Sequence, residues 1–476
     1  MMHVKSQMNS DMKSKMNYSY KYIWMISLVA AMGGLLFGYD WVVIGGAKPF
    51  YERYFEITSS PSMQGLAMSS ALFGCLFGAL ISGFISDTYG RKKPLILSAL
   101  LFLFSAVGVG FADSFTAFMI YRAIGGIGIG LASHLSPVYI AEISPPSMRG
   151  KLVSVNQLTI VLGIVGAQLV NWLIAEKVPV DFNDNDILIS WNGQMGWRWM
   201  FWAAGIPAAM FLVLAFFIPE SPRWLVKQGL NKKAASILAK LGDQEYATVE
   251  LNAITTTLNS ENQGASLSKL FTRKYRFVLI LGVVLAMFQQ WCGINVVFNY
   301  AEEVFVAAGY GVSEMLLNVV VTGSVMLVFT LVAMFNVDKW GRKKLMLIGA
   351  LSLTFFYFFL AAGYYFQLKG FLMLLLVLLA IASYSISLAP VTWIILSEIF
   401  PNAIRGMAMS VATFALWFAC IVLTYTFPFL IKGLNAWGTF GLYGIICISG
   451  FVFILKYLPE TKGKSLEEIQ KDLIKE

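Results

Sequence analysis

The stretch MISLVAAMGGLLFGYDWVVI, residues 25–44, decides the fold of this chain. It is apolar over the roughly 20 residues that a helix needs to cross a bilayer, and its only charged residue is Asp40. A carboxylate inside a membrane span costs several kcal/mol unless it is paired, solvated or protonated. Either Asp40 lies just beyond the membrane surface or it is buried. Because the run stays apolar to Ile44, burial is favoured.

The composition is that of an integral membrane protein. The chain has 476 residues, of which 58% are hydrophobic and 13% charged, whereas soluble domains carry roughly a quarter charged residues. The apolar runs are continuous and of helical length, which favours an α-helical bundle over a β-barrel. The four cysteines (Cys75, Cys292, Cys420, Cys447) fall in or near these runs without metal-ligand spacing, so neither a metal site nor a disulfide framework is predicted.

The apolar runs predict about twelve membrane spans. They lie near residues 22–47, 65–86, 95–112, 115–138, 153–174, 198–218, 276–300, 316–337, 345–366, 370–396, 407–431 and 438–458. We therefore expect an all-α membrane protein with an N-terminal tail (1–21), a six-helix bundle (22–218), a helical linker (219–275), a second six-helix bundle (276–458) and a C-terminal tail (459–476).

The positive charges predict the orientation. The formal charge is +9, and most basic residues cluster in loops that fall on one side, such as Arg91-Lys92-Lys93 and Arg342-Lys343-Lys344. Positive loops face the cytoplasm, so both tails and the linker are expected there, in a plasma membrane such as a bacterial inner membrane. This use of the charge leaves no reason to expect a nucleic-acid partner.

The two halves repeat one another. SDTYGRKK (86–93) matches VDKWGRKK (337–344), EISPPSMRG (142–150) matches EIFPNAIRG (398–406), and PESPR (219–223) is echoed by PETKG (459–463). The corresponding motifs are about 240 to 256 positions apart. A duplicated six-span unit predicts two similar bundles with a binding site between them, the geometry of alternating access.

Taken together, these motifs resemble the sugar porters of the major facilitator superfamily, in particular bacterial proton–xylose symporters and glucose facilitators. The resemblance also rests on YRAIGGIGIG (121–130), PESPRWL (219–225), and Gln289-Gln290 followed by Gly293-Ile294-Asn295. It covers residues 22–465. Each motif alone is moderately specific, whereas their order along the chain is highly specific.

Asp40 and Arg122 form the candidate proton-coupling site. The predicted topology places both in the outer half of the first bundle, where opposite charges compensate each other and protonation of Asp40 releases the pairing. The alternative is a static ion pair that only holds two helices together. The resemblance implies coupling, since proton-coupled members carry Asp and Arg at these positions and facilitators typically carry Asn in place of the Asp.

Neutral amides are the candidate sugar ligands, because they match hydroxyl groups without the desolvation cost of charges. On an ideal helix Gln289 and Asn295 would point about 240° apart, but a break at Gly293 would let both face one cavity. The alternative is that buried amides only join helices. With the aromatic and amide positions that the resemblance implies, the predicted substrate-binding residues are Phe37, Gln157, Gln289, Gln290, Asn295, Asn299, Trp393 and Trp417.

Three positions depart from the xylose symporters, which have Tyr at Asn299, Asn at Met326 and Gln at Leu416. A buried sugar hydroxyl left without a partner costs about 1–3 kcal/mol. We therefore do not expect xylose to be bound in the manner of that family, and another pentose, a hexose, a deoxy sugar or a cyclitol fits as well.

Charged residues at the cytoplasmic ends of the spans form a candidate gate. Opposite charges there can hold the two bundles together in one conformation and separate in the other. Some of these arginines also serve the positive-inside rule. The predicted gate residues are Asp87, Arg91, Glu142, Arg149, Asp338, Arg342, Glu398 and Arg405.

The sequence thus predicts a proton-coupled monosaccharide symporter that acts on a pentose, hexose or related polyol. The alternatives are an uncoupled facilitator and a transporter-like sugar sensor. An enzyme is not expected, since no nucleotide-binding loop, metal cluster or catalytic triad occurs. The predicted partners are a sugar and the bilayer, the only coupling ion is a proton, no cofactor is needed, and the protein is expected to be monomeric.

Overall fold

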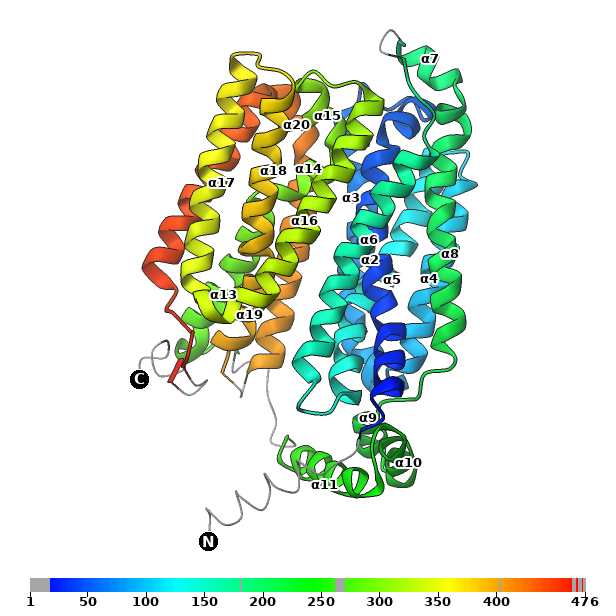
Figure 1. The fold of residues 1–476 in the computed structure, drawn as a ribbon, viewed down its shortest axis with the longest axis vertical. Helices are drawn as coiled ribbons and strands as arrows, with labels where there is room; N and C mark the ends of the chain where they lie inside the picture. Colours follow the sequence, from blue (N-terminus) through cyan, green and yellow to red (C-terminus); the bar gives the residue numbers. More distant parts are fainter. Residues whose placement is uncertain are drawn as a thin grey trace.

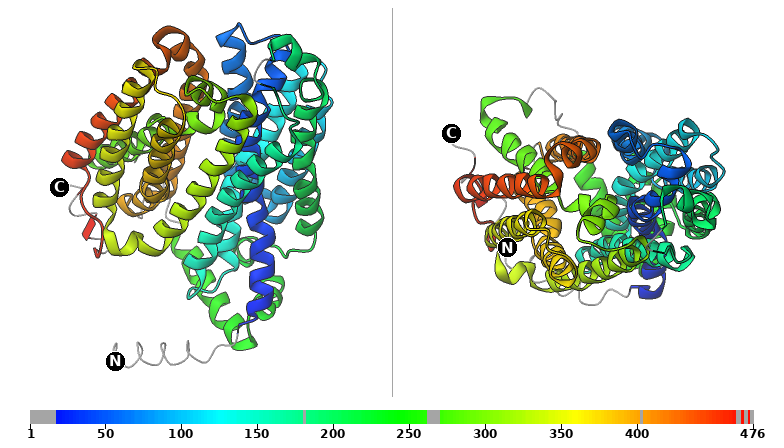
Figure 2. Two further views of the ribbon diagram at one scale, coloured as in Figure 1. Left: turned by 45° about the horizontal axis from the view of Figure 1, so that its top comes forward. Right: turned by 90° about the horizontal axis from the view of Figure 1, so that it is seen from above.

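The structure is a computed structural model that describes residues 18–179, 182–261, 270–401, 404–464, 468–469 and 473. Figure 1 shows two helical bundles standing side by side, with short helices beneath the first bundle. The view from above in Figure 2 separates the N-terminal helices from the C-terminal helices into two groups. The predicted all-α membrane fold is confirmed.

The helices follow one another in three blocks. The N-terminal block comprises α2 (Tyr20–Tyr54), α3 (Pro61–Tyr89), α4 (Lys92–Gly110), α5 (Phe115–Ile143), α6 (Arg149–Ile174), α7 (Asp184–Ile189), the π-helical turn η1 (Asn192–Gly196) and α8 (Trp197–Ala215). The linker holds α9 (Pro222–Lys227), α10 (Asn231–Leu241) and α11 (Gln244–Glu261). The C-terminal block comprises α13 (Arg273–Trp291), α14 (Ile294–Asn299), α15 (Ala301–Ala307), α16 (Val312–Trp340), α17 (Arg342–Tyr365), α18 (Phe371–Ile386), α19 (Leu388–Ile399) and α20 (Arg405–Tyr457).

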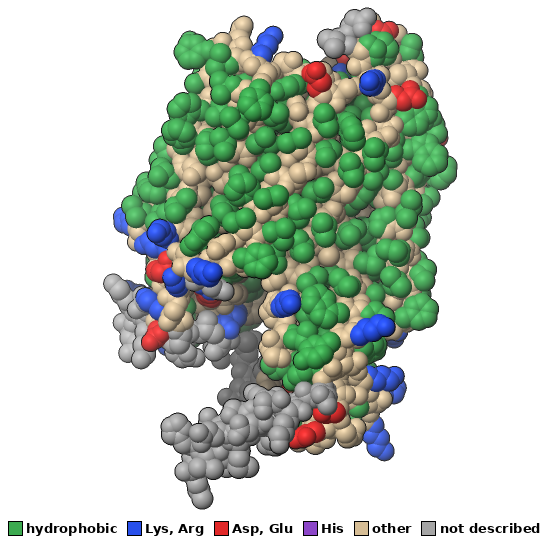
Figure 3. Space-filling model, viewed as in Figure 1, with side chains coloured by type: hydrophobic (Ala, Val, Ile, Leu, Met, Phe, Trp, Pro, Cys, Tyr) green, Lys and Arg blue, Asp and Glu red, His purple; other side chains and the backbone are tan. Residues whose placement is uncertain are grey.

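Within the described ranges, 11 helical segments are long and apolar enough to span a membrane. The last of them, α20, is a run of 53 residues interrupted at Asn435, where φ is 57° and ψ is 178°. This break divides α20 into the two spans predicted at 407–431 and 438–458, which gives the expected twelve. Figure 3 shows hydrophobic side chains covering the middle of the molecule and charged ones near its ends, as lipid contact requires.

Helix α2 is longer than its predicted span. It continues through Pro49 to Tyr54, about two turns beyond the predicted end at residue 47. The extra turns carry Lys48 and Glu52, which are both buried and lie 3.0 Å apart as an i, i+4 ion pair. The prediction from hydropathy ended the span before Lys48. The ion pair between Lys48 and Glu52 allows the helix to continue past that point.

Glycines bring α2 and α6 into close contact. A Cβ atom added at Gly38 would lie 1.9 Å from the carbonyl oxygen of Ile160, and one at Gly163 would lie 2.0 Å from that of Leu35. Small residues allow membrane helices to approach to backbone contact. Here the contact fixes the segment of α2 that carries Asp40.

We therefore expect Gly163→Ala to destabilise the protein by about 1–3 kcal/mol, because the added methyl group overlaps the backbone of α2. The measurement is the apparent unfolding temperature of the detergent-solubilised protein. Gly166→Ala is the matched control on the same helix, since nothing lies within 4 Å of its added Cβ. Equal unfolding temperatures for the two variants would contradict the proposed contact.

Candidate functional site

Asp40 and Arg122 form a buried ion pair between α2 and α5. The Nη1 atom of Arg122 lies 2.7 Å from Oδ1 of Asp40, and the two residues are 2% and 9% exposed, respectively. The Arg122 guanidinium also lies over the ring of Phe201, 5.6 Å from its centroid. Among the described residues, Oδ2 of Asp40 and Nε of Arg122 have no hydrogen-bond partner. The pair is therefore electrically compensated but incompletely hydrogen-bonded, so its protonation state can change without dismantling a full network.

Both halves of the protein line the small cavity beside this pair. From the N-terminal half it is lined by Asp40, Trp41 and Arg122, and from the C-terminal half by Asn299 at the end of α14. Asn299 is buried, and its side-chain oxygen has no hydrogen-bond partner among the described residues. A charged site in one half thus faces an unsatisfied polar group of the other half.

Three aromatic rings from both halves meet next to the ion pair. The ring centroids of Phe37 and Trp417 are 5.9 Å apart, and Trp41 lies 5.8 Å from Phe37 and 6.0 Å from Trp417. Phe37 and Trp417 were predicted from the sequence, whereas Trp41 was not. Its signal was present, because a tryptophan next to the only charge of a span lies too deep to be an interface anchor.

A chain of amides joins α13, α14 and α18. Gln289 donates to the hydroxyl of Tyr384 at 2.8 Å, Gln290 donates to the side-chain oxygen of Gln289 at 2.7 Å, and Asn295 donates to that of Gln290. The predicted break occurs at Gly293, where φ is +85°, a left-handed conformation that glycine adopts without strain. This break brings Asn295 to the same side as the two glutamines. Tyr384 was not predicted from the sequence, because a single hydroxyl group in an apolar span gives no distinct pattern.

The remaining predicted sugar ligands stand apart from this chain of amides. Gln157 is half-buried on α6, and Trp393 is exposed on α19. The structure records no contact between either residue and the amide chain or the aromatic rings. Both remain predictions.

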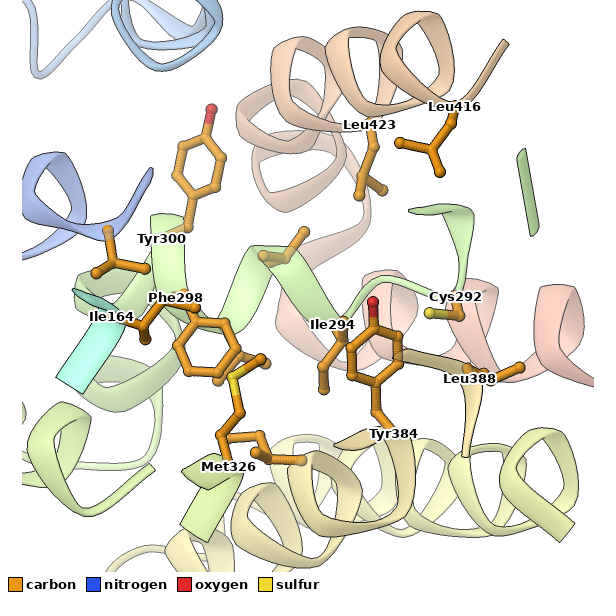
Figure 4. Packing of buried hydrophobic residues seen from close by; sticks show 14 of the residues in the cluster. Ile164, Cys292, Ile294, Phe298, Tyr300, Met326, Tyr384, Leu388, Leu416 and Leu423 are labelled. Atoms are coloured by element: carbon orange, nitrogen blue, oxygen red, sulfur yellow. The ribbon is translucent and has the colours of Figure 1, made fainter. Parts of the chain in front are cut away.

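The two apolar departures from the related symporters are buried in the C-terminal half. Met326 of α16 lies beside Phe298 in Figure 4, with Ile164 of α6 on the other side of that ring. Leu416 is also buried, and it projects from α20 to the same side as Leu423 in Figure 4. Both positions at which the resemblance implied a hydrogen-bonding group are therefore apolar and buried.

In this conformation the described pairs of the predicted gate charges lie within one half or join it to the linker. Arg91 binds Glu142 through two bonds of 2.8 and 2.9 Å, and Arg342 lies 3.1 Å from Glu398. Asp87 pairs with Lys227 of the linker at 3.0 Å.

The other gate residues lie outside these pairs. Arg149 is exposed, and Arg405 donates to the carbonyl oxygen of Phe400. The side chain of Asp338 lies outside the described residues.

Two further acids bind the backbone of the gate arginines. They do so in the same way in both halves, as expected for an internal repeat. Glu220 accepts a hydrogen bond from the backbone N–H of Arg91 at 2.8 Å, and Glu460 accepts one from that of Arg342 at 2.9 Å. Each carboxylate thereby caps the start of a helix, α4 or α17. The repeated Pro-Glu motifs carried this signal, but the sequence did not show which groups the acids bind.

The two halves are joined by ion pairs at the end opposite the linker. Lys48 of α2 lies 3.3 Å from Glu302 and 2.7 Å from Glu303 of α15, and Arg53 lies 3.0 Å from Glu302. Together with Glu52 we call these residues the Lys48 cluster. Since the ion pairs described at the linker end stay within each half, the conformation is closed at the Lys48 end.

We expect Arg122→Gln to destabilise the protein by about 3–5 kcal/mol, because it leaves the buried carboxylate of Asp40 without its cation. The double variant Asp40→Asn/Arg122→Gln removes both charges and should recover much of this loss. Thermal unfolding in detergent measures both. A double variant no more stable than Arg122→Gln alone would contradict the electrostatic coupling.

A family model and several known proteins match this chain over nearly its whole length. A family model described as "Sugar (and other) transporter" matches residues 26–473. The D-xylose-proton symporter of Escherichia coli (strain K12) is 39% identical, over 95% of this chain and 96% of its own. The arabinose-proton symporter of Bacillus subtilis (strain 168) is 37% identical over 100% of both chains.

The similarity extends to solved structures. The inward open conformation of the xylose transporter from E. coli superposes with a TM-score of 0.82 at 38% sequence identity, covering 94% of this chain and 99% of that one. The chain is therefore a transporter and not an enzyme, and it belongs to the sugar transporter family, the sugar porters of the major facilitator superfamily.

Proposed function

We propose that this protein is a proton-coupled monosaccharide symporter in which Asp40 carries the proton and Arg122 responds to it. The observation that carries this proposal is the buried Asp40–Arg122 pair, which faces a cavity lined by both halves. The relatives described as proton symporters of xylose and arabinose support it.

Protonation changes the balance of forces around Arg122. When Asp40 is ionised, the pair is neutral and ties α2 to α5. A proton on the free Oδ2 removes the negative charge and turns an acceptor into a donor. Asn299 of the other half offers an unsatisfied side-chain oxygen in the same cavity. The position of Asn299 supports a role in which protonation of Asp40 in one half changes the contacts of the other half.

The amide chain is the proposed sugar site of the C-terminal half. Gln290 and Gln289 present both donors and acceptors, and a sugar hydroxyl can replace any of their mutual hydrogen bonds at little cost. The rings of Phe37 and Trp417 supply flat apolar faces against which the C–H groups of a sugar ring pack. Gln157, Trp393 and Asn295 remain proposed members of this site.

The substrate is proposed to be a pentose, a hexose or a related polyol. Met326 and Leu416 present apolar groups, so a sugar seated there gains no hydrogen bonds from them. A substrate with fewer hydroxyl groups on that side, or one bound in a shifted position, avoids the resulting loss.

Charge distribution supports the proposed orientation. The basic loops and the linker lie at one end of the bundles, which we assign to the cytoplasm. By the same rule we propose that both termini are cytoplasmic. The Lys48 cluster then belongs to the extracellular gate. We propose a monomer in the plasma membrane.

Asp40→Asn should abolish accumulation of sugar driven by a pH gradient while leaving sugar counterflow active, because the variant cannot release a proton at Asp40. The measurement is uptake of a panel of labelled sugars into proteoliposomes with and without a gradient. Asp113→Asn is the control, since Asp113 is an exposed acid paired with Arg198. Gradient-driven accumulation by Asp40→Asn would refute the assignment of Asp40.

Gln290→Ala should weaken binding of the transported sugar about 5- to 150-fold, which corresponds to the loss of about 1–3 kcal/mol of hydrogen bonding. Isothermal calorimetry on the purified protein measures this affinity. Asn336→Ala serves as the control, because among the described residues the side chain of Asn336 donates to the carbonyl oxygen of Val332 in its own helix. Unchanged affinity in Gln290→Ala would place the sugar elsewhere.

A further inference from the structure

The Lys48 cluster is a buried network at the junction of the two halves. Lys48 and Glu52 are each 1% exposed. The Lys48 ammonium lies 3.0 Å from Glu52, 3.3 Å from Glu302 and 2.7 Å from Glu303, so one cation holds three carboxylates. Surface ion pairs contribute little to stability, but charges withdrawn from water must be balanced closely.

The cluster contains more acids than bases. Arg53 is its second cation, and it pairs with Glu302 at 3.0 Å and with Asp184 of α7 at 2.8 Å. Asp184 is largely exposed at the margin and is solvated. The side chains of Glu52, Glu302 and Glu303 are 2%, 14% and 20% exposed. These three buried or largely buried carboxylates therefore face two cations, which leaves one excess negative charge when every group is ionised. An unbalanced buried carboxylate takes up a proton more readily than one in water.

Two carboxylate oxygens are available for that proton. The Oε1 atom of Glu52 and the Oε2 atom of Glu303 are buried and have no hydrogen-bond partner among the described residues. In contrast, both oxygens of Glu302 accept bonds, from Lys48 and from Arg53. The second oxygen of Glu52 accepts from Lys48 and from Gln64 of α3.

The two tyrosines beside the cluster do not change its charge. The ring centroid of Tyr300 lies 5.9 Å from the Lys48 ammonium, and Tyr51 is buried next to the cluster on α2. Phenols stay neutral below about pH 9, so they leave the excess charge in place. Glu52 and Glu303 come from different halves and touch the same ammonium, so a proton on either one relieves the repulsion between them.

We propose that Glu52 and Glu303 form a second proton-binding site, distinct from Asp40, which is complete only when the two halves meet and which stabilises the conformation closed at this end. When the halves separate, Lys48 and Glu52 leave together on α2, whereas Glu302 and Glu303 leave on α15. Water then solvates each carboxylate, and the proton returns to the side from which it came. This proton is not transported; it sets the conformational equilibrium.

The direction of the pH effect follows from linkage. The closed conformation binds the proton more tightly than the open one, so acidification favours closure and alkalinisation favours opening. The ratio of closed to open molecules changes by at most about tenfold per pH unit for one such proton. The proposal rests on the proposed function only for the assignment of this end to the extracellular side.

Distances between spin labels across this end test the proposal in lipid nanodiscs. The labels are placed at Ser59→Cys and Leu368→Cys, two exposed positions in loops of the different halves, while the four native cysteines are buried. All variants carry Asp40→Asn, so that protonation at position 40 cannot contribute to the pH dependence. We expect the closed population to rise as pH falls from about 8 to about 5.

Glu52→Gln and Glu303→Gln should each remove this pH dependence and leave the closed population high, because each abolishes the excess charge. Asp184→Asn is the matched control and should keep the pH dependence. A parent without a pH-dependent distance, or the same dependence in both glutamine variants, would overturn the proposal; using two variants guards against one that fails to fold. Since this readout is a distance and not transport, it stands apart from the accumulation assay for Asp40.

Discussion

The structure depends on the compensation of charge inside a medium that does not solvate it. Asp40 remains in a membrane span because Arg122 of another helix lies 2.7 Å away. Glycine contacts between α2 and α6 hold the carboxylate at that depth. The same constraint operates at the far end of α2, where Lys48 is balanced by carboxylates from both halves. One long helix thus carries both the site that would bind a transported proton and the charges that join the bundles.

At the linker end, the two halves carry the same arrangement of charged residues. Glu220 and Glu460 bind equivalent arginine backbones, and the arginine side chains bind acids of their own half. In this conformation the described ion pairs of these networks therefore stay within their own half. The contacts that cross between the halves lie at the Lys48 end and around the central cavity. A rocking motion needs to change only these crossing contacts.

The parts of this arrangement that depend on position along one helix could be predicted from the sequence. The depth of Asp40 and Arg122 followed from counting residues. The break at Gly293 was implied by the family resemblance, and the angle between Gln289 and Asn295 showed only what such a break would allow. Sequence reasoning missed Trp41, Tyr384 and the Lys48 cluster because their roles come from contacts between helices far apart in the chain. Nothing in the local sequence around Lys48 shows that Glu303 of the other half lies against it.

Under the proposed function, the ion pair between Asp40 and Arg122 also makes transport respond to the membrane voltage. With Asp40 ionised the pair is electrically neutral, whereas protonation leaves the guanidinium as one net positive charge inside the membrane. Moving one elementary charge across the membrane is worth about 2.3 kcal/mol per 100 mV. In the proposed orientation, a voltage that is negative inside would pull the proton-loaded form inward, yet would exert no comparable force on the empty form as it returns. The electrical and chemical parts of the proton gradient then act on the same half of the cycle.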